Sequence, residues 1–324
     1  MTDADSAGGG GPVVVLSHPG DFHATIVLDR LASWGVPAFL FDISNLPARQ
    51  TLTIDHGGER PSVRVRHHEQ GVVDLSDARS VWWRRPQVVS LEEMADPDAR
   101  AFCYGEWHEA LSGMYALLDC PWMNPLVADQ VASHKALQLA VAPKFGLSVP
   151  ATLMTSDADE VRAFVAKLGE DQVIYKIFAA THQVWRETRV LRADDLEHLD
   201  RLHLAPVIFQ ECVPGVADIR VTVVGDDLYA MAIDGRDSDD IDFRLRMGKT
   251  LTSAHTLPDD VAAGLRALMK HFGLVYGGAD FRLTPQGEYV FLEVNPAGEF
   301  LFCEKGAGYP LTDAVAGWLA RPPG

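Results

Sequence analysis

The stretch GGADFRLTPQGEYVFLEVNPAG, residues 277–298, decides the fold of this chain. Two runs rich in aromatic and aliphatic residues flank a Pro-Gln-Gly turn, a pattern typical of a β-hairpin. Three polar residues interrupt these runs: Asp280 in the first, and Glu293 and Asn295 in the second. A buried carboxylate is costly without a partner, so this hairpin indicates a site as well as a core.

Side-chain alternation brings the three polar residues to one face of the hairpin. With the turn centred on Pro285–Gln286, Asp280 is expected to face Phe291 across the ladder. Glu293 then lies one step further along the same face, followed by Asn295. The hairpin therefore predicts three oxygen donors that converge on one side of the sheet.

Two close carboxylates in apolar surroundings favour a cation between them. Mg²⁺ prefers hard oxygen ligands, commonly one or two carboxylates completed by water and phosphate. We therefore expect Asp280, Glu293 and Asn295 to be Mg²⁺ ligands. The alternative is that the carboxylates pair with Arg282 or Arg244 at the surface.

Composition limits the class of protein. A length of 324 residues predicts one large domain or two to three smaller ones, and 47% hydrophobic with 23% charged residues is typical of a folded chain. The net charge of −17 disfavours a general nucleic-acid binder, because phosphate contacts need clustered Lys and Arg. The charge does not exclude a nucleotide held by a few local cations and a metal.

The chain shows no signal for membrane insertion or secretion. No apolar run of about 18 residues is present, and the acidic start MTDADSAGGGGP lacks a secretory pattern. The cysteines are far apart in sequence, which favours free thiols over a metal site; they are Cys103, Cys120, Cys212 and Cys303. We therefore expect a cytoplasmic protein.

Periodicity predicts an α/β opening followed by α+β structure. Residues 13–16 and 37–43 are expected to be strands around a helix over 23–34, and prolines near Pro125 mark a boundary. Helices are also expected over 128–146, 156–169 (with Ser156 as N-cap), 259–272 and 311–320. The expected division is a disordered tail (1–12), an N-terminal α/β domain (13–125), a central subdomain (126–208) and a C-terminal subdomain with the metal site (209–324).

Two further predicted strands carry polar residues that are candidates for binding a ligand. Lys176 interrupts the apolar run QVIYKIF and must find an anion, such as bound phosphate, unless it reaches solvent at a strand edge. FQECV ends at Pro214, where the chain changes direction; an adenine could bind such a hinge, with Glu211 accepting from its amino group.

The run DIRVTVV separates polar from apolar residues by alternation. Asp218, Arg220 and Thr222 share one face, which makes Arg220 a candidate for binding phosphate. Arg244 and Arg246 supply further cations, unless they belong to a solvated loop. In VWWRRP, Arg84 and Arg85 fit substrate contacts and structural ion pairs equally well.

In order, Lys176, FQECV, DIR, Asp280 and LEVNPAG resemble the motifs of the ATP-grasp superfamily over roughly residues 126–320. The resemblance implies ATP bound between two α+β subdomains, preceded here by a pre-ATP-grasp α/β domain. It implies Lys135 and Lys176 at the phosphates, Glu211 and Val213 at the adenine, Asp218 near the ribose, Gln210 as a further ATP-binding residue, and Asp280, Glu293 and Asn295 at Mg²⁺.

A narrower resemblance covers nearly the whole chain. VWWRRP, NPLVADQVASHKALQL, VPATLMT, FQECVPGVADIRVTVVGDDLYAMAID and FLEVNPAGEFLFCE are similar to the graspetide (microviridin-type) ligases. This implies an enzyme of ribosomal-peptide maturation that acts on a leader-bearing precursor peptide and closes esters or amides from Asp or Glu onto Thr, Ser or Lys. It also implies a homodimer.

The chain departs from the family pattern at two places. AATHQVWRE replaces the usual glycine-rich phosphate loop, so phosphate coverage would fall to other backbone or to His182. The ending GEFLFCE, with Glu299 and Phe302, differs from the aromatic version of the best-known members. The second departure bears on the substrate.

The expected chemistry is ADP-forming ligation through an acyl phosphate. Arg220 and Arg244 are expected to stabilise phosphoryl transfer and the tetrahedral intermediate, with no covalent nucleophile. Two alternatives remain. A ligase that joins free amino acids or modifies a small metabolite would share every nucleotide residue. A non-catalytic ATP-binding regulator is disfavoured by four intact residues: Asp280, Glu293, Asn295 and Lys176.

Overall fold

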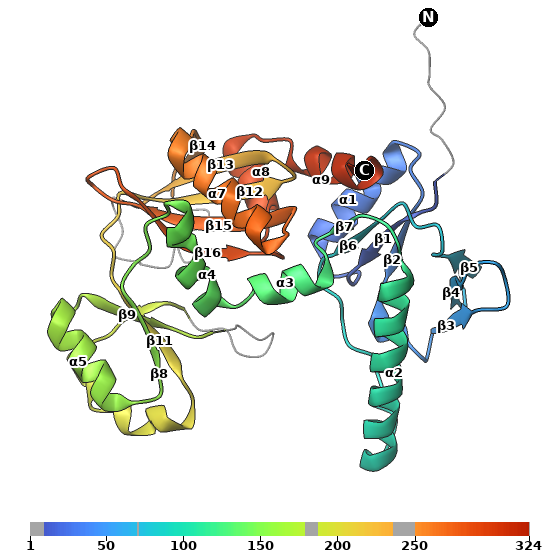
Figure 1. Ribbon diagram of the computed structural model, residues 1–324, viewed down its shortest axis with the longest axis horizontal. Coiled ribbons are helices and arrows are strands. Elements are labelled where there is room, and N and C mark those ends of the chain that lie inside the picture. The colour runs from blue at the N-terminus through green and yellow to red at the C-terminus, as the bar shows by residue number, and fades with distance from the viewer. Residues whose placement is uncertain (1–9, 70, 179–186, 236–249, 324) are drawn as a thin grey trace, which may run out of the picture. The chain divides into compact units, whose positions relative to one another are not determined.

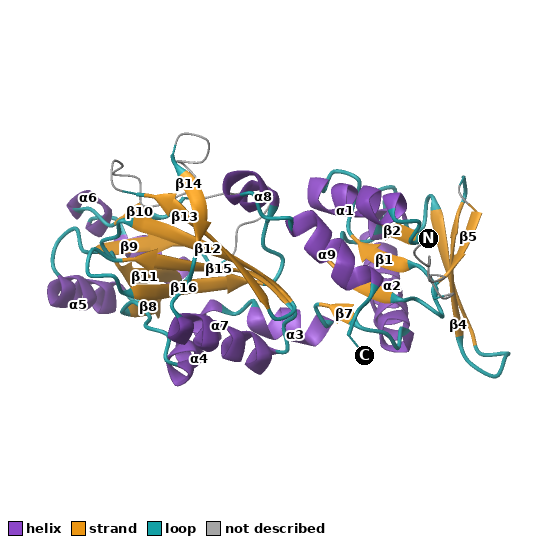
Figure 2. Ribbon diagram, turned by 90° about the horizontal axis from the view of Figure 1, so that it is seen from above, coloured by secondary structure: helices purple, strands orange, loops and turns teal. Residues whose placement is uncertain are grey.

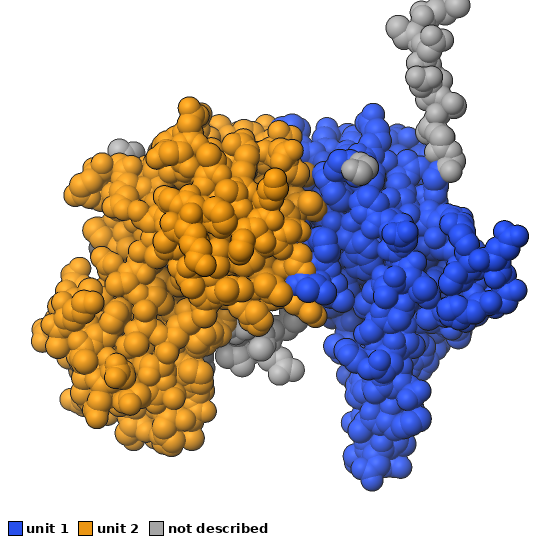
Figure 3. All heavy atoms as spheres, viewed as in Figure 1, with its two compact units in different colours: residues 1–127, 310–324 blue, residues 128–309 orange. Residues whose placement is uncertain are grey.

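The computed structural model describes residues 10–69, 71–178, 187–235 and 250–323; no helix within these ranges is long and apolar enough to cross a membrane. The chain forms two compact units (Figure 3): unit 1 comprises residues 1–127 with 310–324, and unit 2 comprises residues 128–309. The last helix, α9 (Leu311–Ala320), was grouped by sequence with the C-terminal subdomain. It belongs to unit 1, where it packs against α1 (Phe22–Ser33).

Unit 1 is built on a parallel sheet in the order β2–β1–β6–β7, of which β2, β1 and β7 are labelled in Figure 2. An antiparallel sheet of order β3–β4–β5 follows β2, and the long helix α2 follows β6 (Figure 1). The elements are β1 (Val13–Leu16), β2 (Ala38–Phe41), η1 (Ile43–Asn45), β3 (Gln50–Asp55), β4 (Ser62–His67), β5 (Gly71–Asp74), β6 (Ser80–Trp83), α2 (Pro97–Leu117) and β7 (Trp122–Met123).

Local sequence explains how β1 passes into α1. All four residues of β1 are buried, and α1 buries an apolar stripe formed by Ala24, Val27 and Leu31. Asp21 caps the helix by accepting from the backbone N–H of His23 at 3.1 Å. The same carboxylate accepts from Nε of Arg84 at 3.1 Å, in an ion pair whose side chains are 0% and 1% exposed. Arg84 therefore joins the end of β6 to the start of α1 through a structural ion pair.

Unit 2 contains two antiparallel sheets, and the first has the order β10–β9–β11–β8. Helix α5 packs on it through Val161, which shares a core with Val173 and Phe209. The elements of this part are β8 (Thr152–Thr155), α5 (Ala158–Leu168), β9 (Val173–Lys176), β10 (Arg189–Val190), α6 (Ala193–Leu196), η3 (Leu199–Leu204) and β11 (Val207–Glu211).

The second sheet of unit 2 has the order β14–β13–β12–β15–β16. Its apolar face, including Ile219 and Phe281, shares a core with Leu265 and Leu268 of α7. That packing leaves the alternate residues of β12 and β15 on the opposite face, where the site forms. The elements are α4 (Lys135–Val141), η2 (Ala142–Phe145), β12 (Ala217–Val224), β13 (Asp227–Asp234), β14 (Thr252–His255), α7 (Asp259–Phe272), β15 (Tyr276–Leu283), β16 (Tyr289–Asn295) and α8 (Leu301–Ala307).

Two expectations about helices were wrong. The helix expected over 128–146 is broken into α3 (Leu126–Ala132), α4 and η2. At the break, Ser133 Oγ donates to the carbonyl of Asp129 at 2.8 Å, and His134 takes an extended conformation as N-cap of α4. Helix α5 is capped by Asp157 rather than Ser156, because the Asp157 side chain accepts from a backbone N–H of the first turn at 2.8 Å.

Candidate functional site

The polar face of the second sheet in unit 2 brings Asp280 and Glu293 directly opposite each other. The expected pairing of Asp280 with Phe291 was wrong, because Phe291 faces Phe281. The connecting loop covers 284–288, and a bulge between Asp280 and Phe281 shifts the register by one more residue. Leu292 is the extra residue of β16, so Phe291 enters the core beside Phe281 while Glu293 joins Asp280 on the polar face.

Asp280 forms an ion pair with Arg220 on the neighbouring strand. The two residues lie opposite each other on β15 and β12, and Nη1 of Arg220 donates to both carboxylate oxygens, at 2.9 and 2.7 Å. The side chains are only 7% and 13% exposed. Burial raises the pKa of Asp280 even though Arg220 opposes the rise, and the nearby Glu293 carboxylate raises it further.

Glu293 is held by two lysines. Lys135, the first residue of α4, forms an ion pair with it, and Lys176 at the end of β9 also acts on its charge. Burial raises the pKa of Glu293, but the two ammonium groups outweigh burial and hold the pKa at about 2. Glu293 is therefore ionised at neutral pH and lies between cations from two different elements.

The donor set fits a hard cation in its chemistry. Asn295 lies opposite Gly278, on the face that carries Asp280 and Glu293, and its Oδ1 accepts from the backbone N–H of Ala297 at 3.0 Å. Two carboxylates and an amide are the kinds of ligand that Mg²⁺ takes. In the described part of the chain, no three His, Cys, Asp or Glu side chains cluster as metal ligands, so a cation here would need Asn295, water or phosphate.

Arg282, the alternative partner considered for these carboxylates, pairs instead with Asp218, at 2.7 Å. Its Nε also donates to the carbonyl of Val213 at 3.3 Å. Arg282 thus joins Val213, in the hinge after β11, to Asp218 at the start of β12. The two polar pairs of β12, Asp218–Arg282 and Arg220–Asp280, follow each other along one face.

The positions expected to bind ATP line the end of β11. Lys176 Nζ donates to Gln210 Oε1 at 3.1 Å, and the buried Gln210 donates in turn to Thr152 Oγ1 at 2.8 Å. Glu211 accepts from the backbone N–H of Ala151 at 3.1 Å, which leaves its second oxygen for other donors. Lys176 is thus oriented between a buried amide and the Glu293 carboxylate.

Some expected site residues are not described. Arg244, Arg246 and His182 lie outside the described residues. Most of AATHQVWRE lies there as well.

Sequence reasoning missed Gln138, which fixes the geometry of the site. Gln138 is 1% exposed, and its amide donates to the carbonyls of Ala132 and Val294 while accepting from the N–H of Val294 at 2.8 Å. It therefore ties α4 to the backbone beside Glu293. A glutamine one helical turn after Lys135 was the available signal, but it carries no chemistry of its own.

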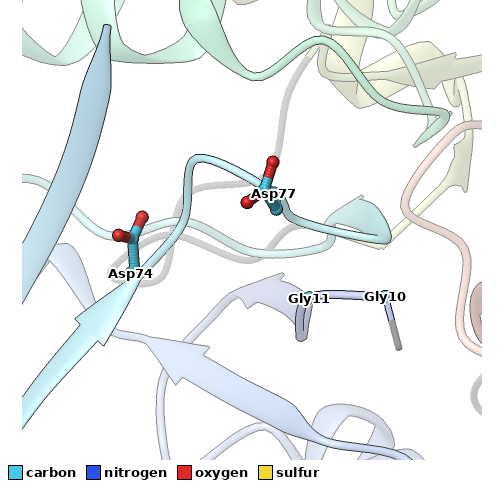
Figure 4. A pocket seen from close by; sticks show the side chains of 4 residues that line it. All are labelled: Gly10, Gly11, Asp74 and Asp77. Atoms are coloured by element: carbon cyan, nitrogen blue, oxygen red, sulfur yellow. The ribbon is translucent and has the colours of Figure 1, made fainter. Parts of the chain in front are cut away.

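Two other places in the described part of the chain, a buried thiol and a hollow in unit 1, do not fit nucleophilic catalysis or cation binding. Burial raises the pKa of Cys303 to about 11, so the thiol beside Arg220 stays neutral and does not act as a nucleophile. A hollow in unit 1 is lined by Gly10, Gly11, Asp74 and Asp77 (Figure 4). Its two carboxylates are already engaged, by Ser76 and by Arg60.

Comparisons with known proteins find relatives over nearly the whole chain. Residues 12–130 match the family model of the MvdD pre-ATP-grasp domain. The structure is similar to macrocyclase MdnB from Microcystis aeruginosa MRC, with 30% identity and a TM-score of 0.80 over 95% of this chain and 99% of that one. It is also similar to the ATP-grasp ligase PsnB complexed with minimal precursor, Mg and ADP, with 29% identity and a TM-score of 0.75 over 98% and 99% of the two chains.

A curated relative carries a different name. A probable alpha-L-glutamate ligase from Klebsiella pneumoniae (strain 342) is 26% identical over 277 residues, covering 81% of this chain and 90% of that protein. PsnB and the curated relative are both named ligases, and the macrocyclase matches nearly end to end at a higher identity than the curated relative. The chain therefore belongs to the graspetide (microviridin-type) family of ATP-grasp ligases and is an ADP-forming ligase with an N-terminal pre-ATP-grasp domain.

Proposed function

We propose that this ligase activates Asp or Glu side chains of a precursor peptide as acyl phosphates and closes them onto Thr, Ser or Lys as ω-esters or ω-amides. One observation carries the proposal: a partly buried row of alternating charges, Arg220–Asp280 beside Glu293–Lys135, in a chain similar over 95% of its length to a macrocyclase. Such a row can balance the charge of a nucleotide triphosphate and a metal inside a protein with a net charge of −17.

The nucleotide would bind between the two sheets of unit 2. Lys135 and Lys176, which both act on Glu293, would bind phosphate oxygens. Glu211 and the backbone of Val213 would meet the adenine at the end of β11, with Asp218 near the ribose. Gln210 would orient Lys176, because its Oε1 accepts a hydrogen bond from the Lys176 ammonium at 3.1 Å.

Asp280, Glu293 and Asn295 would hold Mg²⁺, which when bound offsets the charge of the transferring phosphoryl group. The ion pairs that Asp280 and Glu293 form with Arg220 and Lys135 keep both carboxylates ready as ligands without an uncompensated charge. In Asp280, burial and the neighbouring Glu293 both favour the protonated form, and a second positive charge would favour the ionised form.

The reaction would run in two steps. A substrate carboxylate oxygen attacks the γ-phosphorus, the bond to the β-phosphate oxygen breaks, and ADP leaves. A hydroxyl or amine then attacks the acyl carbon, loses its proton, and inorganic phosphate leaves with the ester or amide formed. Arg220 and Arg244 would stabilise the negative charge in both transition states.

The substrate assignment is part of the proposal. PsnB, which is similar to 98% of this chain, was solved with a minimal precursor, and this supports a precursor peptide as substrate. That the peptide carries a leader is part of the same proposal. Cytoplasmic location belongs to the same proposal, since ATP and a nascent peptide meet in the cytoplasm. The homodimer stays a prediction from the family resemblance.

A second candidate is a ligase that adds a free amino acid such as glutamate. The similarity to a probable alpha-L-glutamate ligase over 81% of the chain favours it. This candidate uses the same nucleotide residues and differs only in the acceptor. The acceptor therefore decides between the two.

The test is Mg-dependent ADP release from the purified protein with synthetic peptides rich in Asp, Glu, Thr and Lys, set against single amino acids. Each product is examined by mass spectrometry for loss of water. Turnover with peptides and a dehydrated product would support the peptide ligase. Turnover confined to free amino acids would overturn it in favour of the second candidate, and the Glu293→Gln variant supplies the inactive control.

A further inference from the structure

The guanidinium of Arg220 is confined by more than its ion pair. Nη2 donates to the backbone carbonyl of Glu299 at 3.3 Å, and Cζ lies 5.5 Å from the centre of the Phe302 ring, at the start of α8. Nε is buried and has no hydrogen-bond partner among the described residues. Hydrogen bonds therefore fix one edge of the group, and packing must fix its plane.

Gly278 supplies the other surface that the guanidinium touches. This residue sits in the interior of β15, opposite Thr222, on the same face as Arg220. A Cβ on Gly278 would lie 2.7 Å from Cζ and from Nη2, and 2.9 Å from Nε. Glycine weakens a strand interior, so its presence here needs a local reason. The volume taken by the guanidinium is that reason.

We propose that Gly278 and Phe302 are positioning residues that hold the plane of the Arg220 guanidinium for phosphoryl transfer. Gly278 leaves the space in which the group lies, and the Phe302 ring covers it, as aromatic faces do for planar arginine. The proposal rests on the proposed function, in which Arg220 stabilises the transferring phosphoryl group. It also gives Phe302, one of the places where the chain departs from its family, a task at the site.

The geometry explains why a small shift would matter. Nη1 contacts both oxygens of Asp280 at 2.9 and 2.7 Å, and rotation of the guanidinium would break at least one contact. Electrostatic stabilisation depends on donors that are held in place before the reaction. Leucine at position 302 would cover the group without a π-face, and alanine at 278 would push it out of its plane.

The kinetic test measures kcat and KM for ATP in four variants: Phe302→Leu, Phe302→Tyr, Gly278→Ala and Arg220→Lys. We expect Phe302→Leu and Gly278→Ala to lower kcat roughly three- to thirtyfold with KM for ATP little changed, and Phe302→Tyr to restore it. The matched control is Phe145→Leu, because Phe145 is also partly buried in unit 2 but packs its ring against His271.

A double-mutant cycle separates positioning from general destabilisation. If Phe302 acts through the guanidinium, Phe302→Leu should cost nothing further in the Arg220→Lys background. In NMR spectra of the arginine side chains, the Arg220 Nε–H signal should shift in Phe302→Leu and return in Phe302→Tyr. A merely structural role of Phe302 would move neither readout.

The possible failures are distinguishable. Wild-type turnover in Phe302→Leu and Gly278→Ala, with Arg220→Lys impaired, would overturn the positioning roles alone. An equal loss on Phe302→Leu in both backgrounds would do the same. Wild-type turnover in Arg220→Lys would overturn the role of Arg220 in the proposed function, and the positioning roles with it.

Discussion

Three carboxylates on the polar face of the second sheet in unit 2 each form an ion pair. Asp218 pairs with Arg282, Asp280 with Arg220, and Glu293 with Lys135. Removing one partner of a buried pair leaves an uncompensated charge, so the cost of a substitution depends on how exposed the remaining partner is. This rule separates substitutions that affect activity alone from those that affect folding.

Glu293→Gln belongs to the first kind. We expect ADP formation to fall by roughly a hundredfold or more, because a proposed metal ligand loses its charge. The side chain of Lys135 is 23% exposed and can turn to water, so the free energy of unfolding should change by less than about 1 kcal/mol. Coupled ADP assays and thermal unfolding test both parts; unchanged turnover would remove Glu293 from the metal site.

Lys176→Met tests the phosphate contact separately from the metal. We expect the affinity for ATP to weaken about tenfold or more, as for a lost charge-assisted hydrogen bond. Calorimetric titration with ATP measures it. Lys167→Met, at an exposed position in the last turn of α5, is the control. Equal affinities in the two variants would show that Lys176 does not contact the nucleotide.

Asp21→Asn should change how the free energy of unfolding depends on pH in the acidic range. Burial raises the pKa of Asp21, but Arg84, Ser17 and His23 outweigh burial and hold it below its ordinary value of 3.8. Because the unfolded chain takes up this proton first, the carboxylate stabilises the fold above about pH 4, and this contribution is lost as pH falls through the folded pKa. Urea unfolding from pH 3 to 7 should give wild-type and Asp21→Asn curves that converge at low pH; parallel curves would contradict this.

The sequence predicted which polar residues share a face better than it predicted which residues they pair with. Strand alternation placed Asp280, Glu293 and Asn295 on one face, but it also placed Phe291 there, and Phe291 lies in the core. The pairing of Asp280 with Glu293 was not predictable, because it depends on a bulge that the local sequence does not announce. Gln138 was missed because a glutamine in a helix is ordinary until its backbone partners on another element are known.

At the scale of elements, periodic segments with clear ends were predicted well. The helices over 259–272 and 311–320 begin and end where expected, since each ends in a glycine or in proline-rich sequence. The prediction of one helix over 128–146 was wrong because the apolar spacing of the sequence continues through the break at Ser133–His134. Periodicity reports the buried face and does not report a side chain that bonds back to the preceding turn.

Two helical glycines should respond to alanine in opposite ways. A Cβ on Gly264 of α7 would lie 2.7 Å from the carbonyl oxygen of Phe145 and 2.9 Å from a methyl carbon of Leu147, so Gly264→Ala should lower the free energy of unfolding by about 1–3 kcal/mol. Gly105 of α2 has no atom within 4 Å of such a Cβ, and Gly105→Ala should raise it by about 0.5–1 kcal/mol. Denaturant unfolding measures both; the same sign in both variants would refute the close packing of α7 on η2.

At the scale of the whole molecule, unit 1 is assembled from two distant segments. Helix α9 buries Leu311, Val315, Ala316 and Leu319 completely, and it packs against α1 and β6. The parallel sheet therefore depends on residues from the far end of the described chain. The sequence did not predict this return, since an apolar helix pattern does not say which domain it will cover.

Val315→Asp should loosen unit 1 selectively, because it places a charge at a fully buried position. We expect hydrogen exchange to rise in β1 and α1 and to stay near wild type in β12 and β15. Hydrogen exchange with mass spectrometry localises the effect. Arg321→Asp, at an exposed position after the helix, is the control. A rise that is equal in both units would contradict the assignment of α9 to unit 1.

The place of α9 has a consequence for how the protein is made. A ribosome releases the strands of unit 1 first, yet the helix that completes their core follows residues 128–309. At about 5–20 residues per second, roughly 10–40 seconds separate the two events. During that interval β1 and α1 have been synthesised, but their apolar surfaces are not yet covered by α9. Unit 1 therefore begins to emerge before unit 2, yet its core is completed after unit 2 has been made. Chaperone capture of the nascent chain should be concentrated in that window.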